Sequence, residues 1–295
     1  MEATARLGEV SLGPDFPVRI MAAVNLSPES FYKGSVAKNA RETASIAMKA
    51  VDAGADIVDI GAMSTAPYLR NEVSEEVEST RVAEALRATA GIGVTISVDT
   101  VRASVAALAL DRGALVINDV SGLKNDPKMA DVIKERGASV IAMARSTEPS
   151  RLGPIPRVRQ ALGETMRIAR KAGIDDRLVV LDPGIGFFRE EGNGKAYSRQ
   201  DVVPWYQWDC EVLANLRQLE SLHRPLCVGL SRKSFLGKIL KLESPDDRLW
   251  GSLAATAIAV NNGARVIRTH DVKETGHAVR VSEAIMKRRG RNRTS

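Results

Sequence analysis

An alternation of short apolar runs with longer segments of helical periodicity constrains the fold of this chain more than any other feature. Eight runs rich in β-branched residues are candidate strands, and a candidate helix follows each of them. The runs span residues 19–25, 55–61, 94–100, 114–121, 138–144, 177–184, 225–231 and 264–271. Because these runs are apolar almost throughout, we expect both faces of each strand to be covered, as in a parallel sheet.

The junctions between helix and strand also repeat. The pair Gly-Ala occurs at residues 54–55, 113–114, 137–138 and 263–264, each time where a helix should end and a strand begin. Glycine after the last helical turn accepts the left-handed conformation that ends many helices. Eight such units in about 270 residues predict an α/β fold, a single-domain (β/α)8 TIM barrel. A doubly wound open sheet is the alternative.

The domain boundaries follow from the same pattern. We assign residues 1–18 to an N-terminal extension, 19–286 to the barrel and 287–295 to a basic C-terminal tail. The formal charge of +6 falls to +1 without the five cations of that tail, Lys287, Arg288, Arg289, Arg291 and Arg293. This favours a solvated tail over an arm that binds a polyanion. Aromatic residues make up 4% of the chain, which leaves few surfaces for base stacking, so we expect no nucleic-acid partner.

Composition and cysteine usage bear on localisation. The chain has 44% hydrophobic and 26% charged residues, as soluble globular proteins do, and no apolar run approaches the roughly 18 residues of a membrane span. The first ten residues lack the basic and apolar regions of a secretory signal. The two cysteines form no CxxC pair, which favours a reducing compartment. We therefore expect a cytoplasmic protein with no membrane partner.

Polar side chains follow most of the apolar runs where each strand should end. In a (β/α)8 barrel, these carboxyl ends form the face that carries the active site. The polar residues at these ends are Asn25, Asp59, Asp99, Asn118, Asp119, Asp182, Ser231, Arg232, Lys233, Arg268, His270 and Asp271. Any one of them alone could serve a turn, as Asp182-Pro183-Gly184 illustrates. The convergence of so many at one rim predicts a binding site.

The residue types at these ends indicate two kinds of ligand group. Asp99, Asn118 and Asp182 offer acceptors and an amide, and Lys233 adds a donor. Such a set suits a flat heterocycle that carries both N–H donors and ring-nitrogen or carbonyl acceptors.

An anion site is indicated beside it, because Arg268 and His270 offer positive charge and donors for a phosphate or pyrophosphate. Arg232 either stacks beside the ligand or pairs with a carboxylate at the rim. Three histidines without HxxxH or HxH spacing make a zinc site unexpected. The chain also contains no GxSxG or GxxxxGK[ST] motif, which counts against those hydrolase and P-loop classes.

Seven motifs in chain order resemble those of the dihydropteroate synthase family, whose members are pterin-binding (β/α)8 enzymes. They are "VNLSPESF", "GADIVDIGAMST", "ISVDT", "INDVSG", "LDPGIGF", "GLSRKSF" and "RTHDVKET". The resemblance runs from about residue 19 to residue 285. The "SRKSF" segment favours the synthase over folate-dependent methyltransferases of the same superfamily.

The resemblance implies a reaction and a set of site residues. The implied transferase joins 6-hydroxymethyl-7,8-dihydropterin diphosphate to p-aminobenzoate and releases pyrophosphate, with Mg2+, in folate biosynthesis. It also implies a homodimer. The pterin ring would contact Asp99, Asn118, Asp182 and Lys233, pyrophosphate would contact Arg268 and His270, Mg2+ would contact Asn25, and Ser231 would lie near the carboxylate of p-aminobenzoate. Thr65 and Met143 complete the implied substrate-binding set, and Asp99, Lys233, Arg268 and His270 are the implied catalytic residues.

Several loop residues depart from the family pattern. Ala66 in "STAPY" replaces an arginine and Met63 replaces a glutamate, with Arg70 nearby as a possible substitute. Lys33 lies in an altered first loop, and "IAMARST" brings a new cation, Arg145, close to the mouth. The segment after the sixth strand, "GFFREEGNG", departs too, and residues 189–201 are expected to form a loop.

These departures lie on loops that admit the second substrate, so alternatives for the acceptor and the reaction stay open. One is a ribosylated arylamine of the kind used for methanopterin-type cofactors. Another is methyl transfer from a reduced pterin to a corrinoid protein, and a third is a pterin-binding homologue without synthase activity. Arg268 and His270 favour diphosphate chemistry, because a methyl donor brings no pyrophosphate.

Overall fold

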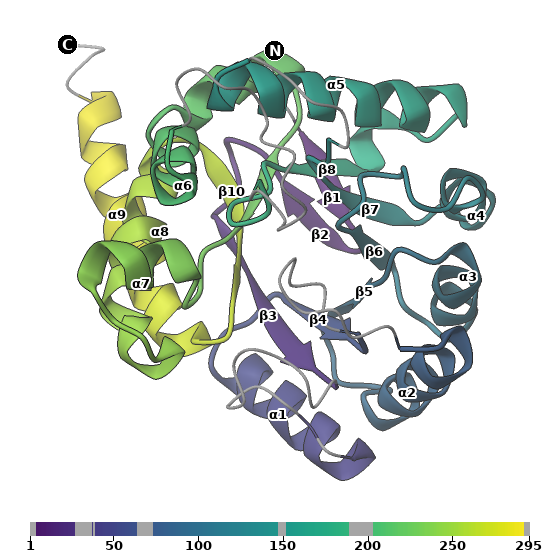
Figure 1. Ribbon diagram of the computed structural model, residues 1–295. Coiled ribbons are helices and arrows are strands. Elements are labelled where there is room, and N and C mark those ends of the chain that lie inside the picture. The colour runs from purple at the N-terminus through teal and green to yellow at the C-terminus, as the bar shows by residue number, and fades with distance from the viewer. Residues whose placement is uncertain are drawn as a thin grey trace.

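Eight parallel strands close into a barrel, and helices surround it (Figure 1). The computed structural model describes residues 4–26, 37, 39–63, 73–146, 152–188 and 203–291. The strand order around the barrel is β10-β3-β4-β5-β6-β7-β8-β9. The predicted single-domain (β/α)8 barrel is therefore confirmed, and the open-sheet alternative is wrong.

Each barrel strand lies within one of the eight apolar runs. The strands are β3 (Arg19–Asn25), β4 (Ile57–Gly61), β5 (Thr95–Asp99), β6 (Val116–Asp119), β7 (Ser139–Met143), β8 (Val179–Asp182), β9 (Leu226–Gly229) and β10 (Ala264–Thr269). Most of them are shorter than the apolar runs, because ladder pairing stops where the chain begins to turn toward a helix. The carboxyl ends of all eight strands consequently meet at one mouth.

The surrounding helices follow the strands in chain order. They are α1 (Ala40–Asp52), α2 (Glu75–Ala88), α3 (Ala103–Asp111), α4 (Met129–Arg136), α5 (Pro154–Lys171), α6 (Trp205–Ala214), α7 (Ser234–Leu240), α8 (Leu249–Asn261) and α9 (Val272–Arg291). Both α7 and α8 lie between β9 and β10. The last helix continues into the segment that the sequence assigned to a tail, and cations near a helix C-terminus are favourable there. None of the helices in the described part of the chain has the length and hydrophobicity of a membrane span.

Strand alternation divides the apolar core into two parts. Residues such as Val58, Ile117 and Val140 face outward and pack beneath the helices. The interior of the barrel holds Met21, Ile57, Val116, Ile141, Val180, Cys227 and Val266. These interior residues come from the first half or the middle of seven of the strands, so the apolar filling lies toward the amino-terminal end of the barrel.

A hairpin of β1 (Ala5–Leu7) and β2 (Val10–Leu12) closes that end. Leu7 and Leu12 are buried and pack into the interior cluster. The turn residue Gly8 has φ 57°, and a Cβ there would lie 2.8 Å from Thr95 Cγ2, so only glycine fits. The sequence had assigned these residues to an extension without predicting the hairpin.

Candidate active site

Four polar side chains from four strands form one buried network at the mouth. Arg268 Nε donates to Asp59 Oδ2 at 2.6 Å, and Arg268 Nη2 donates to Asp99 Oδ2 at 3.3 Å. Asn118 Nδ2 also donates to Asp59 Oδ2, at 3.0 Å. The network thus joins β4, β5, β6 and β10, and it brings together three of the predicted site residues.

Asp59 lies at the centre of this network; the sequence placed it among the polar strand ends, but the family resemblance gave it no role. Its side chain is fully buried and takes hydrogen bonds from both Arg268 and Asn118. The sequence held a signal for this position, because Asp59 stands inside the apolar run "ADIVDIG". A charge within a strand that is covered on both faces requires a partner.

The carboxylates of Asp59 and Asp99 keep acceptor capacity toward the mouth. Burial raises the pKa of Asp99 to about 8, and the charge of Arg268 lowers it only in part, while that of Asp59 raises it further. The Oδ1 atoms of both residues are buried and accept no hydrogen bond within the described part of the chain. Buried acceptors of this kind suit a ligand that brings N–H donors, and Asp99 becomes a full acceptor when it loses the proton that its raised pKa retains at pH 7.

Lys233 and Asp182 lie on the neighbouring part of the rim. Lys233 Nζ donates to Ile185 O and lies 4.7 Å from the centroid of the Phe187 ring, within cation–π range. Asp182 Oδ1 accepts from Gly184 N at 2.7 Å. Burial raises the pKa of Asp182, and the nearby positive charges of Lys233 and Arg268 oppose that rise. The lysine and the carboxylate are therefore close enough to act on one ligand.

His270 lies at the end of β10, and its Nδ1 is 3.4 Å from Ala23 O. Burial, followed by the charge of Arg268, lowers the pKa of His270 to about 4. The imidazole is consequently neutral at pH 7 in the free site, which differs from the positive charge expected from the sequence. Arg268 and Lys233 supply the positive charge instead, and His270 offers a hydrogen bond.

Ser231 is buried at the rim, and its hydroxyl group makes hydrogen bonds to neighbouring rim residues. Its Oγ donates to Asp271 Oδ2 at 3.2 Å, and the backbone N–H of His270 points to the same Oγ at 3.3 Å. Arg232 pairs with Asp271, which confirms the pairing option predicted for this arginine. The structure therefore places Ser231 between the ends of β9 and β10.

Asn25, the last residue of β3, is the predicted Mg2+ ligand. A Cβ built on Gly61 would lie 3.6 Å from Asn25 Oδ1 and 3.9 Å from Asp99 Oδ2, so both oxygens flank the same glycine. Within the described ranges, no group of three His, Cys, Asp or Glu side chains is placed to hold a metal. Mg2+ commonly binds through one or two protein oxygens together with substrate phosphates and waters. The residues present fit that mode of binding.

The end of β7 contributes Met143 and Arg145. Met143 is buried and pairs in register with Asp182. Arg145 is half-buried, and its guanidinium makes no hydrogen bond or ion pair within the described residues. Its carbonyl accepts from Lys124 Nζ at 2.6 Å, which anchors the backbone at this point.

Several residues singled out from the sequence lie outside the described residues. They are Thr65, Ala66, Lys33, Arg70 and the loop predicted after the sixth strand. Their predicted roles remain predictions.

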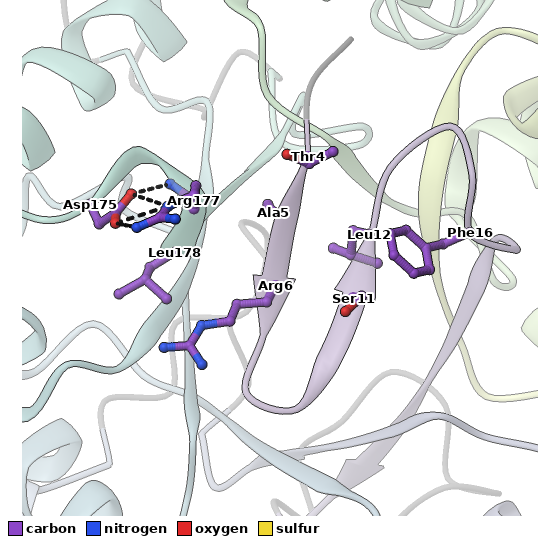
Figure 2. Close-up of a pocket in the computed structure, with 9 residues that line it drawn as sticks. All are labelled: Thr4, Ala5, Arg6, Ser11, Leu12, Phe16, Asp175, Arg177 and Leu178. Carbon is purple, nitrogen blue, oxygen red and sulfur yellow. Dashed lines mark hydrogen bonds and ion pairs between the residues drawn. The ribbon is translucent and has the colours of Figure 1, made fainter.

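A hollow of about 490 Å³ lies at the opposite end of the barrel (Figure 2). Its walls come from the hairpin with Arg6, from Phe16 in the segment after the hairpin, and from residues just before β8 such as Arg177. Figure 2 shows Arg177 bound to Asp175. The distance from Arg177 Nη2 to Asp175 Oδ2 is 2.6 Å, and the two side chains are 75% and 42% exposed. This hollow contains none of the predicted site residues, so it is separate from the candidate active site.

Comparison with known proteins agrees with the geometry of the mouth. Residues 21–270 match the family described as pterin binding enzyme, and the chain belongs to that family. A dihydropteroate synthase of Bacillus subtilis is 34% identical over 272 residues, covering 92% of this chain and 90% of that protein. A dihydropteroate synthase of Escherichia coli is 36% identical over 275 residues, covering 90% and 91%. Within the family, the similarity is to the dihydropteroate synthases.

Solved structures of dihydropteroate synthases share the fold closely. The Yersinia pestis enzyme, solved in a sulfonamide drug complex, has a TM-score of 0.82 at 32% identity, covering 97% of this chain and 99% of that one. The Xanthomonas albilineans enzyme, solved with 4-aminobenzoic acid, has a TM-score of 0.82 at 31% identity, covering 97% and 99%. The Coxiella burnetii enzyme, solved with pteroic acid, has a TM-score of 0.80 at 31% identity, covering 95% and 98%. The resemblance inferred from the motifs is confirmed.

Proposed function

We propose that this chain is a transferase that condenses 6-hydroxymethyl-7,8-dihydropterin diphosphate with p-aminobenzoate and releases pyrophosphate, in folate biosynthesis. The observation that carries the proposal is the buried network of Asp59, Asp99, Asn118 and Arg268 beside Asp182 and Lys233, with two acceptor oxygens that no described residue pairs. The relatives named above, including those solved with pteroic acid or 4-aminobenzoic acid, support it.

The pterin ring would bind at the floor of the mouth. The carboxylates of Asp99 and Asp182 would accept from N–H groups of the ring, and Asn118 and Lys233 would complete the contacts to it. A buried site that matches both donors and acceptors discriminates strongly against a ligand that leaves one of them unpaired. Met143, buried beside Asp182, would pack against the ring.

The diphosphate would lie toward β10 and β3, where Arg268 and His270 offer donors. Asn25, with Asp99 close by, would hold Mg2+, which when bound neutralises charge on the diphosphate. An arylamine is a weak nucleophile, so the main burden falls on departure of pyrophosphate. The methylene C–O bond breaks with its electron pair leaving on pyrophosphate, the C–N bond forms from the amine lone pair, and the amine nitrogen then loses a proton to solvent. The carboxylate of Asp99 or Asp182 would stabilise the positive charge that spreads from the methylene into the ring.

The second substrate would approach from the loops above the mouth. Thr65 belongs to its proposed binding set, and Ser231 would lie near the carboxylate of p-aminobenzoate. Because Ala66 replaces the family arginine, a ribosylated arylamine is the competing acceptor.

A pyrophosphate-release assay tests the proposal. The protein would receive the pterin diphosphate and Mg2+ with either p-aminobenzoate or the ribosylated arylamine. Release of pyrophosphate with p-aminobenzoate supports the proposed function. Release with the ribosylated arylamine alone would identify that arylamine as the acceptor instead. Absence of pyrophosphate with both would exclude the synthase and favour methyl transfer or binding without turnover.

We further propose a cytoplasmic homodimer that uses the outer face of α8 and α9. Trp250 is 77% exposed, and Ile258 lies two helical turns further along the same face of α8. The adjacent helix α9 exposes Val281 and Ile285 in the same way. An exposed apolar strip of this kind marks an interaction surface. Light scattering measures the molar mass of wild type and of Trp250→Glu. We expect wild type to be a dimer and the variant a monomer, and a monomeric wild type would contradict the proposal.

A further inference from the structure

Two residues next to the proposed site residues form a buried ion pair, which we call the rim clamp. Arg232 Nε lies 3.0 Å from Asp271 Oδ2, and Arg232 Nη2 lies 2.7 Å from Asp271 Oδ1. The two side chains are only 7% and 11% exposed. Bidentate arginine–carboxylate pairs are the most directional ion pairs in proteins. The rim clamp therefore joins the loop after β9 rigidly to the loop after β10.

The Nη1 atom and the backbone N–H of Arg232 also donate hydrogen bonds. Its Nη1 donates to Pro245 O at 3.0 Å and to Asp246 O at 2.7 Å, just before α8. Its backbone N–H donates to Ser252 Oγ at 2.8 Å, within α8. The guanidinium is thus held from several sides, and no ligand is needed to fix its position.

The backbone at Arg232 explains how neighbouring side chains diverge. Arg232 has φ 56°, a left-handed conformation that costs energy for a residue with a Cβ. The turn sends the arginine to Asp271 while Lys233, the next residue, reaches Ile185 O beyond the end of β8. Unfavourable conformations of this kind persist where the surroundings determine them, and they concentrate at functional sites.

The other half of the rim clamp is equally close to a proposed site residue. Asp271 directly follows His270, and Ser231 Oγ bridges the two loops through Asp271 Oδ2 and the backbone N–H of His270. Lys233 and His270 are each one peptide bond away from the ion pair. In the proposed function, Lys233 contacts the pterin ring and His270 contacts the diphosphate, which are the two ends of one substrate.

We propose that Arg232 and Asp271 are positioning residues that set the spacing between Lys233 and His270, so that both ends of the pterin diphosphate bind at once. This inference rests on the proposed function. Two linked groups that bind two sites of matching spacing gain affinity over the separate groups, and they lose that gain when the spacing changes. The rim clamp should therefore affect the whole substrate much more than either half.

The test compares the whole substrate with its two halves. The variant is Arg232→Met with Asp271→Leu, which removes both charges together and leaves neither buried and unpaired. Calorimetry measures binding of the pterin diphosphate with Mg2+, of 6-hydroxymethyl-7,8-dihydropterin, and of pyrophosphate with Mg2+. We expect the Kd of the whole substrate to rise about 10- to 100-fold. The Kd of each half should change by no more than about twofold.

A matched control separates positioning from general loss of an ion pair. Arg170 and Asp176 form another bidentate pair, at 3.0 and 2.7 Å, between α5 and the short η2 turn (Asp176–Leu178). The variant Arg170→Met with Asp176→Leu should leave all three Kd values unchanged. If the rim-clamp double variant does not fold, Arg232→Lys replaces it, because lysine keeps the charge and loses the bidentate geometry.

Three outcomes would overturn the rim clamp as a positioning device. Binding of the whole substrate and of its halves could weaken equally in the rim-clamp variant, or binding of none of them could weaken. The control variant at Arg170 and Asp176 could also show the same pattern of Kd values as the rim-clamp variant. Wild-type protein that binds neither the pterin nor its diphosphate would overturn the proposed function, and the rim-clamp proposal with it. That last failure is seen without any variant, so the two are distinguishable.

Discussion

The two ends of the barrel are built from the same eight strands and differ in what fills them. At the amino-terminal end, Leu7 and Leu12 of the hairpin pack against the apolar interior of the barrel. At the carboxyl end, the carboxyl groups of Asp59 and Asp99 are buried to a similar degree, and both pair with Arg268, whose side chain is 23% exposed. A few residues along each strand therefore separate an apolar core from an ionic network.

The comparison shows how stability and function are divided within one fold. Apolar contacts at the hairpin end stabilise the folded protein whether or not a ligand is bound. Buried ion pairs contribute little net stability compared with apolar residues of the same size, but removing one partner is costly. The carboxyl end therefore keeps charges for binding, while the amino-terminal end holds the barrel closed.

The largest loss of stability and binding is expected when the ionic network at the carboxyl end of the barrel is disrupted. Arg268→Met leaves Asp59 and Asp99 buried without their cation, so we expect the free energy of unfolding to fall by about 3–5 kcal/mol. Binding of the pterin diphosphate should be lost as well. Urea denaturation and calorimetry measure both. The control Arg170→Met removes an exposed pair and should cost less than about 1 kcal/mol; equal effects of the two variants would contradict the comparison.

Breaking the apolar end should affect stability alone. Leu7→Ala removes a fully buried side chain of the hairpin, and we expect unfolding to become easier by about 2–5 kcal/mol. The kcat/KM of the folded protein should stay at the wild-type value, because the hairpin lies at the opposite end from the mouth. A loss of kcat/KM at a temperature where the variant is fully folded would show that the two ends are coupled.

The raised pKa of Asp99 predicts that pterin binding depends on pH. Below its pKa of about 8 the residue holds a proton, and the ionised form accepts more strongly from a ligand N–H. Affinity should therefore rise by up to about tenfold per pH unit between pH 6 and pH 8 and then level off. Calorimetry across this range measures the slope, and Asp99→Asn should abolish it. A wild-type slope equal to that of Asp99→Asn would assign the titration to another group.

The same pKa predicts that the stability contribution of Asp99 falls as pH rises, whereas the affinity for the pterin rises. The folded state holds the proton on Asp99 up to a pKa of about 8, whereas the ordinary value is 3.8. Between these values the folded state binds more protons than the unfolded state, so the contribution of Asp99 to stability falls as pH rises. Urea denaturation measures the free energy of unfolding at pH 5 and pH 8. Its decrease between these two pH values should be larger for wild type than for Asp99→Asn. A matching decrease in the variant would contradict this assignment.

The smallest effect is expected at Arg145, which follows β7 and whose guanidinium has no partner among the described residues. Arg145→Ala should change the free energy of unfolding by less than about 0.5 kcal/mol. It should lower kcat/KM by up to about tenfold at low salt, because a rim cation attracts anionic substrates. Arg6→Ala removes an equal charge at the opposite end and should leave kcat/KM unchanged. If both variants act alike, net charge and not position is responsible.

The sequence predicted the barrel well and the site in part. The eight apolar runs and the Gly-Ala junctions depend on local periodicity, and each run contains a barrel strand. The hairpin was missed because its strands have three residues each, too few to show a period. Asp59 was noticed as a strand-end residue without being recognised as the centre of the network. The neutral state of His270 was not foreseen, because its pKa depends on burial.

The sequence by itself determined which residues reach the mouth of the barrel, because strand ends can be read from neighbours along the chain. Only the tertiary structure decided how those residues pair. Arg268 and Asp59 are 209 positions apart, and their ion pair exists because β10 closes the barrel against β3, beside β4. Protonation was decided in the same way, since the pKa values of Asp99 and His270 follow from desolvation inside the closed barrel. Charge pairing and burial are properties of the folded chain, and local patterns do not contain them.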